Sequence, residues 1–248
     1  MLIPAFVFLV GICVGSFLNV VAFRTHEKRS FVSGRSACRA CGTAIAPYDL
    51  IPVISYVMLG GRCRACTATI SPQYPLVEFA TGALFAAFYV HDGLTAMLAR
   101  DLTFVAFLVV LFVYDARYMQ ILDRFTVPAA LIALAANVAL GMGVGNALLG
   151  ALVCGGFFAA QYAVSRGRWV GGGDIRLGAV MGLMLGWPLS LVALIVAYLV
   201  GALYAFCLLA AGKAKMQTQI PFGTFLSFAT VVTMLFGTQI VAWYLGRM

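Results

Sequence analysis

The sequence has few charged residues. Only 10% of its 248 residues are Asp, Glu, Lys or Arg, against about 25% in an ordinary soluble domain, and 63% are hydrophobic. A soluble fold has no interior large enough to bury so much apolar side chain. The scarcity of charge therefore excludes a soluble globular protein. The apolar runs are continuous rather than alternating, which favours an all-α polytopic membrane protein over a transmembrane barrel.

Histidine is also scarce. The two histidines are His26, in a basic stretch, and His91, near a later acid. Neither accompanies a serine or cysteine motif, so a Ser-His-Asp type of nucleophilic site is disfavoured. Any hydrolytic chemistry in this chain has to come from other residue types.

The apolar runs predict about eight transmembrane helices, each near the ~20 residues that a crossing requires. The first is expected to be retained, because no basic residue precedes it and no small-residue cleavage site follows it. We expect the eight helices at roughly 3–23, 75–91, 96–114, 126–142, 146–165, 175–188, 190–211 and 223–245.

The basic residues predict the orientation. With eight crossings and the N-terminus outside, all Lys and Arg fall on inner loops except Arg100 and Arg247. This asymmetry accounts for the net charge of +8 without any nucleic-acid partner. We therefore divide the chain into a first transmembrane helix (1–23), a cytoplasmic insert (24–74) and a transmembrane bundle (75–248).

The insert contains the motif CRAC twice, at 38–41 and 63–66. Two C-x-x-C pairs at this separation predict a tetrahedral zinc site, which would stabilise an insert too small for a secure core. Two disulfides or a redox pair are the alternatives, and the reducing inner side disfavours disulfides. Four thiolates leave no open position, so the zinc would be structural. The expected ligands are Cys38, Cys41, Cys63 and Cys66.

Most of the eight acidic residues have simple interpretations. Glu27 and Asp49 are expected to be solvated in the insert, and Asp92 and Asp101 to mark an outer loop. Glu78, at the start of the second expected helix, either faces a functional site or caps its helix.

Asp115, Asp123 and Asp174 remain. Two crossings separate Asp115 from Asp174, so both are expected at the inner membrane face, with Asp123 nearby. Acids at membrane depth are costly and usually face a cavity or a partner. Two adjacent carboxylates disfavour ionisation of both, so one keeps a proton while the other activates water. This is the chemistry of peptide hydrolysis without a covalent intermediate.

Other interpretations of these residues stay open. Asp174 could act purely as a helix N-cap. The glycines before it, Gly171 to Gly173, let an extended substrate approach the backbone or simply form a flexible loop end. The acids could also serve a transporter or proton relay, or be structural parts of a metal-anchored scaffold. Clustering at one face favours the hydrolytic site.

The motifs together resemble a known family. The chain resembles the bacterial prepilin peptidases (type IV leader peptidases), which are GxGD-type intramembrane aspartic proteases, over nearly its whole length. The similar segments are GSFLNVVAFR (15–24), the two CRAC motifs, DLIPVISY (49–56), GGRCRAC (60–66), YPLVE (74–78), Asp115 with Asp123, GGGD (171–174) and IPFGTFLSF (220–228). The chain departs from the family pattern at Leu122, where Pro is common, at Arg176 for Lys, and at Thr224 for Pro.

The resemblance implies an activity. The family removes the basic leader from type IV prepilins and type II secretion pseudopilins at the cytoplasmic face of the bacterial inner membrane. Many members with the cysteine insert also methylate the new N-terminus with S-adenosylmethionine. By motif position, Asp115 and Asp174 correspond to the catalytic pair and the four cysteines to the metal ligands. Gly171, Gly173, Asp123 and Glu78 are expected to support the substrate site.

Overall fold

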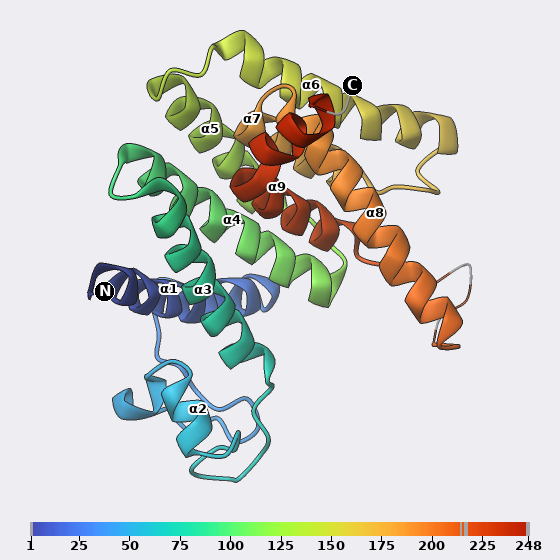
Figure 1. Ribbon diagram of the computed structural model, residues 1–248. Helices are drawn as coiled ribbons and strands as arrows, with labels where there is room; N and C mark the ends of the chain where they lie inside the picture. Colours follow the sequence, from blue (N-terminus) through green and yellow to red (C-terminus); the bar gives the residue numbers. More distant parts are fainter. Residues whose placement is uncertain (1, 214, 216–217, 247–248) are drawn as a thin grey trace. The chain divides into compact units, whose positions relative to one another are not determined.

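The computed structural model describes residues 2–213, 215 and 218–246 (Figure 1). Within these ranges every regular element is helical, and β-structure is limited to two isolated bridges. Arg247, one of the two basic residues expected outside, is not among the described residues. The chain separates into two compact units, residues 1–98 and 99–248.

The first unit is built on two long helices, α1 (Leu2–His26) and α3 (Gln73–Asp92). They pack closely because Gly11 and Gly15 of α1 form a small-xxx-small pair. A Cβ added at Gly11 would lie 2.8 Å from the Cα of Gly82, and one at Gly15 would lie 2.9 Å from the Cα of Glu78. The glycines thus let the two backbones approach one another.

The insert between α1 and α3 is mostly irregular. It contains a short 3-10 helix, η1 (Pro47–Leu50), and one short α-helix, α2 (Ile54–Met58). The bridges Ala37–Ala44 and Arg62–Thr69 each enclose one CRAC motif. The sequence predicted neither α2 nor η1, because segments this short carry no helical periodicity.

The second unit contains six helices among its described residues. They are α4 (Ala96–Tyr118), which begins just before the unit boundary, α5 (Asp123–Ala139), α6 (Val144–Ser165), α7 (Gly172–Leu185), α8 (Leu189–Ala210) and α9 (Phe222–Leu245). The shortest of them, α7, contacts α5, α6, α8 and α9 and lies among them (Figure 1). Residues 180–185 of α7 are all buried, which makes this helix the core of the unit.

Each of the eight expected helices corresponds to a helix in the structure. Five of them are long and apolar enough to cross a membrane: α1, α4, α6, α8 and α9. The remaining three are less apolar or shorter, since α5 has 17 residues and α7 only 14. The structure thus supports a multi-pass helical membrane protein, while the number eight for the crossings remains a prediction.

Candidate active site

Asp115 lies in the last turns of α4 and is 4% exposed. Its Oδ2 accepts a hydrogen bond of 2.9 Å from the backbone N–H of Thr224, in the first turn of α9. The first N–H groups of a helix lack partners within it and attract negative charge. The segment Ile220–Phe225 therefore brings a helix N-terminus to this carboxylate.

Asp174 lies in the first turn of α7. Its Oδ2 accepts a hydrogen bond of 2.9 Å from the backbone N–H of Gly171, the N-cap residue. This is the acidic half of a capping box. Asp174 therefore helps to cap α7 from the third helical position, but the N-cap is Gly171 and not Asp174. The helix begins at Gly172, three residues before the expected start, because Gly171 is extended and Asp174 caps the turn.

The two carboxylates lie at the same end of the second unit and interact electrostatically. Ile121 connects their surroundings. A Cβ added at Gly173 would lie 2.9 Å from the Cβ of Ile121, and one added at Gly223 would lie 2.9 Å from both Asp115 Oδ2 and Ile121 Cδ1. Glycine at both positions lets the N-termini of α7 and α9 close around the segment that follows α4.

Asp123 is the first residue of α5, which begins three residues before the expected helix. Its carboxylate forms an ion pair with Arg176 of α7. The Arg176 Nε also donates to the carbonyl of Gly172, at 3.3 Å. Asp123 therefore supports the glycine turn that carries Asp174 and is itself neutralised by an arginine.

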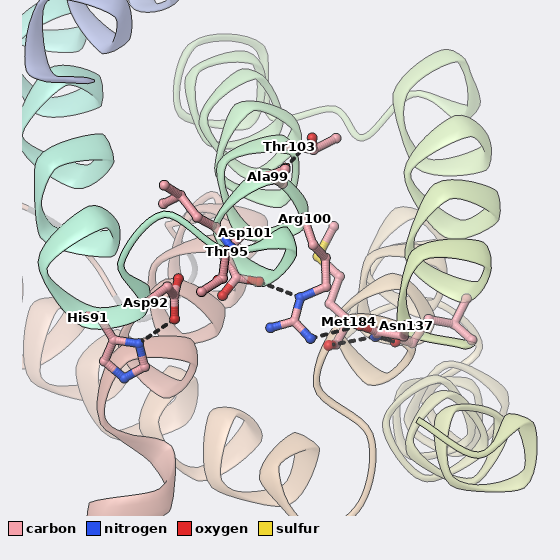
Figure 2. A network of polar contacts seen from close by, with 11 residues as sticks. His91, Asp92, Thr95, Ala99, Arg100, Asp101, Thr103, Asn137 and Met184 are labelled. Atoms are coloured by element: carbon pink, nitrogen blue, oxygen red, sulfur yellow. Dashed lines mark hydrogen bonds and ion pairs between the residues drawn. The ribbon is translucent and has the colours of Figure 1, made fainter. Parts of the chain in front are cut away.

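A buried polar network holds the opposite end of α7. Asn137 of α5 is fully buried, and its Nδ2 donates to the carbonyls of Leu183 and Met184 at 2.7 and 2.9 Å (Figure 2). Its Oδ1 accepts a hydrogen bond of 3.3 Å from Arg100 of α4. The sequence analysis missed Asn137, although a lone amide within the apolar run 131–140 was a visible signal.

Two acids differ from their expected state. Asp101 is 3% exposed and accepts a 2.6 Å hydrogen bond from Arg100 Nε, so it does more than mark a loop. The side chain of Asp49 is 8% exposed and is held by Arg64 through bonds of 2.7 and 2.9 Å. The interpretation of Asp49 as solvated was wrong, because a partner 15 residues away covers it.

Glu78 belongs to the first unit. Its carboxylate does not cap α3 but accepts a 2.7 Å hydrogen bond from the backbone N–H of Val53, and the Ser16 side chain of α1 also bonds to it. Glu78 thus joins three parts of that unit: α1, α3 and the insert.

The four cysteines of the insert form a cluster suited to a metal. Their Sγ atoms all lie within 4.8 Å of one another, and Cys38 Sγ is 3.8 Å from Cys66 Sγ. Tetrahedral zinc with bonds of about 2.3 Å places its sulfurs about 3.8 Å apart. Each cysteine is free in the structure, so these thiols match a zinc site and not a pair of disulfides.

The two halves of the cluster repeat one backbone design. Cys38 and Cys63 each donate an N–H bond of 2.9 Å to the carbonyl five residues on, and each accepts one of 2.9 Å from the residue four positions on. That fourth residue has a positive φ in both halves, 72° at Gly42 and 56° at Thr67. The repeated CRAC motif is therefore a structural duplication with an offset of 25 residues.

The surroundings of two of the four thiols favour metal binding. The hydrogen bond with the Thr43 side chain is the main cause that lowers the pKa of the Cys41 thiol to about 6. Backbone N–H groups of Cys66 and Ala65 lower the pKa of Cys63. The thiolate is the form that binds zinc, so these contacts prepare two of the four ligands.

Comparisons with known proteins agree with this arrangement. The family described as "Bacterial Peptidase A24 N-terminal domain" matches residues 9–91, and the "Type IV leader peptidase family" matches residues 102–206. A relative from Bacillus subtilis (strain 168) is 31% identical over 239 residues, which cover 96% of each chain. The chain belongs to the type IV leader peptidase family.

Other relatives of this leader peptidase come from further bacteria. One from Myxococcus xanthus is 38% identical over 226 residues, covering 88% of this chain and 67% of the relative. One from Pseudomonas aeruginosa is 31% identical over 265 residues, covering 96% and 91%. All three bear the name prepilin leader peptidase/N-methyltransferase. No solved structure matches the chain. The family does not favour the transporter and scaffold alternatives.

Proposed function

We propose that this protein is a membrane-embedded aspartic endopeptidase that removes the leader of type IV prepilins and type II secretion pseudopilins and methylates the new N-terminus. One observation carries the proposal: Asp115 and Asp174 interact at one end of the second unit, each bonded to a backbone N–H at a helix start. Aspartic proteases use two adjacent carboxyl groups, of which one is ionised and the other is protonated. The names of the relatives supply the substrate class.

In the proposed reaction the ionised carboxylate takes a proton from water, and the water oxygen attacks the carbonyl carbon of the scissile peptide. The protonated carboxyl group donates a hydrogen bond to the carbonyl oxygen. When the tetrahedral species collapses, the C–N bond breaks and the amine leaves with a proton from the pair. The proton is a property of the pair rather than of one aspartate.

The backbone contacts have a defined task in this scheme. The Thr224 and Gly171 N–H groups each bind one oxygen of their carboxylate, which fixes the rotamers of both acids before substrate arrives. Such pre-organisation lowers the barrier because no reorientation is needed during reaction. A Cβ added at Gly171 would meet no atom closer than 3.6 Å, so the backbone is open there beside Asp174, and we place an extended substrate segment against it. Gly173 instead packs against Ile121.

The distribution of basic residues supports an active site at the cytoplasmic face of the inner membrane. A prepilin has a short basic leader followed by an apolar helix, so this helix can lie in the bilayer while its cleavage point reaches the acids. The methyl group would come from S-adenosylmethionine and be transferred to the amine that cleavage creates. The zinc would be held by Cys38, Cys41, Cys63 and Cys66 and would order the insert.

Mass spectrometry of prepilin processing tests the proposal. We would incubate the purified protein in detergent with a prepilin, with and without S-adenosylmethionine. We expect loss of the leader in both, and one added methyl group only with the donor. Asp115→Asn and Asp174→Asn should each lower the cleavage rate by roughly 10²-fold or more, since each removes acid–base chemistry.

Asp92→Asn is the matched control, because it makes the same change at an acid outside the proposed pair. It should cleave like the unaltered protein. A folded Asp174→Asn variant with full cleavage would overturn the assignment of the pair. Cleavage without methylation would leave the peptidase and remove the transferase from the proposal.

A further inference from the structure

The insert exposes an apolar patch that neither the metal site nor the proposed catalytic pair uses. It consists of residues on η1, α2 and the link between them, each between 44% and 80% exposed: Tyr48, Leu50, Ile51, Ile54, Val57 and Met58. Ile54, Val57 and Met58 share one face of α2. Clusters of exposed apolar side chains of this kind mark interaction surfaces.

The charge pattern identifies the kind of surface that the patch fits. Residues 47–61 contain a single charged side chain, Asp49, and Arg64 neutralises it through two hydrogen bonds. The arginine also holds the pKa of the Asp49 carboxyl below its usual value, mainly by these hydrogen bonds. A segment with an apolar face and no unpaired charge can enter lipid without burying an isolated charge.

The contacts of Val53 place this segment beside the apolar part of α1. Its N–H donates to Glu78, and the backbone of Glu78 lies against Gly15 of α1. Gly15 is eight residues before Phe23, the last apolar residue of α1, or about 12 Å along the helix axis. Even if the extended Glu78 side chain and its hydrogen bond run along this axis, Val53 lies beside α1 before its apolar segment ends.

A second part of the insert folds back on α1 in the same direction. The ring of Phe31 lies 6.4 Å from that of Phe17, which is also within the apolar segment. On α3, Leu76 and Phe79 flank Glu78 in sequence and are 66% and 56% exposed. α3 thus exposes apolar side chains close in sequence to the residue that binds the Val53 N–H.

The backbone around Val53 is adapted to a place with little water. Val53 has φ 63° and ψ −53°, and the Ile54 N–H bonds to the Pro52 carbonyl at 2.6 Å. This is a γ-turn of the strained kind, which is rare for a β-branched residue. Its outward N–H is satisfied by Glu78, and Ser55 Oγ donates to the Tyr48 carbonyl at 2.9 Å. Unpaired backbone groups are costly in lipid.

From these observations we propose that residues 47–58 form an interfacial segment whose apolar patch inserts into the lipid bilayer beside α1 and α3. Glu78 is its anchor, since it binds the turn from within α3. By analogy with amphipathic interfacial helices, the patch lies about 5–10 Å below the headgroup boundary. The insert is then not a freely solvated domain, because its central segment rests in the membrane.

Depth-dependent fluorescence quenching tests the proposal on the full-length protein. The background would carry Trp169→Phe, Trp187→Phe and Trp243→Phe, which replace the three tryptophans of the sequence. Met58→Trp or Val57→Trp is then the probe on the patch, and Ala44→Trp, at an exposed position three residues after the first CRAC motif, is the control. Each variant is reconstituted in phosphatidylcholine–phosphatidylglycerol vesicles with acyl chains brominated at successive depths.

We expect the patch tryptophans to be quenched several times more than the control, most strongly by bromine near the headgroup end of the chain. Adding Glu78→Ala should reduce this quenching, whereas Glu78→Gln, which keeps an acceptor for the Val53 N–H, should preserve it. Quenching of the patch equal to that of the control would overturn the proposal. If brominated lipid does not quench the fluorescence of a patch tryptophan, but addition of a prepilin shifts its emission, the surface would be assigned to a protein partner instead.

Discussion

The two CRAC turns are predicted to differ in backbone strain, and this difference should affect zinc affinity. Both turns need a residue with positive φ directly after the second cysteine, and the chain uses Gly42 in one and Thr67 in the other. A Cβ added at Gly42 would have no atom within 4 Å. Gly42→Ala therefore tests backbone conformation alone, without a steric clash.

The size of the effect follows from backbone energetics. The left-handed conformation costs an L-residue about 1–2 kcal/mol, and replacing glycine returns about 0.4–1 kcal/mol by restricting the unfolded chain. The net cost of Gly42→Ala is about 1 kcal/mol, or roughly fivefold in zinc affinity, because folding of such an insert is coupled to metal binding. Thr67→Gly relieves the same strain and should tighten zinc by a similar factor.

The assay is competition for zinc between the full-length protein in detergent and a chelating dye. The double variant Gly42→Ala/Thr67→Gly should return close to the starting affinity. Gly42→Asn is the matched control, since asparagine tolerates positive φ, and it should lose less than alanine. Equal affinities for Gly42→Ala, Thr67→Gly and the unaltered protein would refute the coupling between these turns and the metal.

Three further predictions concern the second unit. Gly173→Ala places a Cβ 2.9 Å from Ile121 and should slow prepilin cleavage by roughly 10²-fold, because it displaces Asp174. Gly172→Ala is the control: its added Cβ meets nothing within 4 Å, and this variant should cleave normally. Gly223→Ala crowds Asp115 Oδ2 at 2.9 Å; we expect a similar loss of cleavage with unchanged zinc content, and normal cleavage would contradict the tight approach. Asn137→Ala leaves two α7 carbonyls unpaired and should lower the free energy of unfolding in detergent by about 1–3 kcal/mol, measurable by thermal melting.

The long apolar helices could be predicted from the sequence because their signal is local. In a bilayer, a continuous run of apolar residues bounded by Gly, Pro or a charged residue forms a helix. Each expected helix corresponds to a helix in the structure. The start of α7 was placed three residues late. Three successive glycines suggest a loop, but the capping bond from Gly171 to Asp174 begins the helix inside the glycine run.

The long-range polar contacts could not be predicted, because each depends on a residue far away in the sequence. Asp115 meets Thr224 across 109 positions, and Asn137 meets Leu183 across 46. The sequence indicated that Asp115 and Asp174 share a membrane face, but the helix start that binds Asp115 came only from the packing. Asp49 was wrongly expected to be solvated for the same reason, since the residue that covers it is Arg64 of the second CRAC motif.

The shortness of α7 has a consequence for how water reaches Asp174. Its 14 residues span about 21 Å, whereas the hydrocarbon layer is about 30 Å thick. In the predicted eight-helix topology, α7 therefore falls about 9 Å short of a full crossing. Because α7 contacts α5, α6, α8 and α9, protein rather than lipid meets this shortfall, and we expect water to approach Asp174 between these helices.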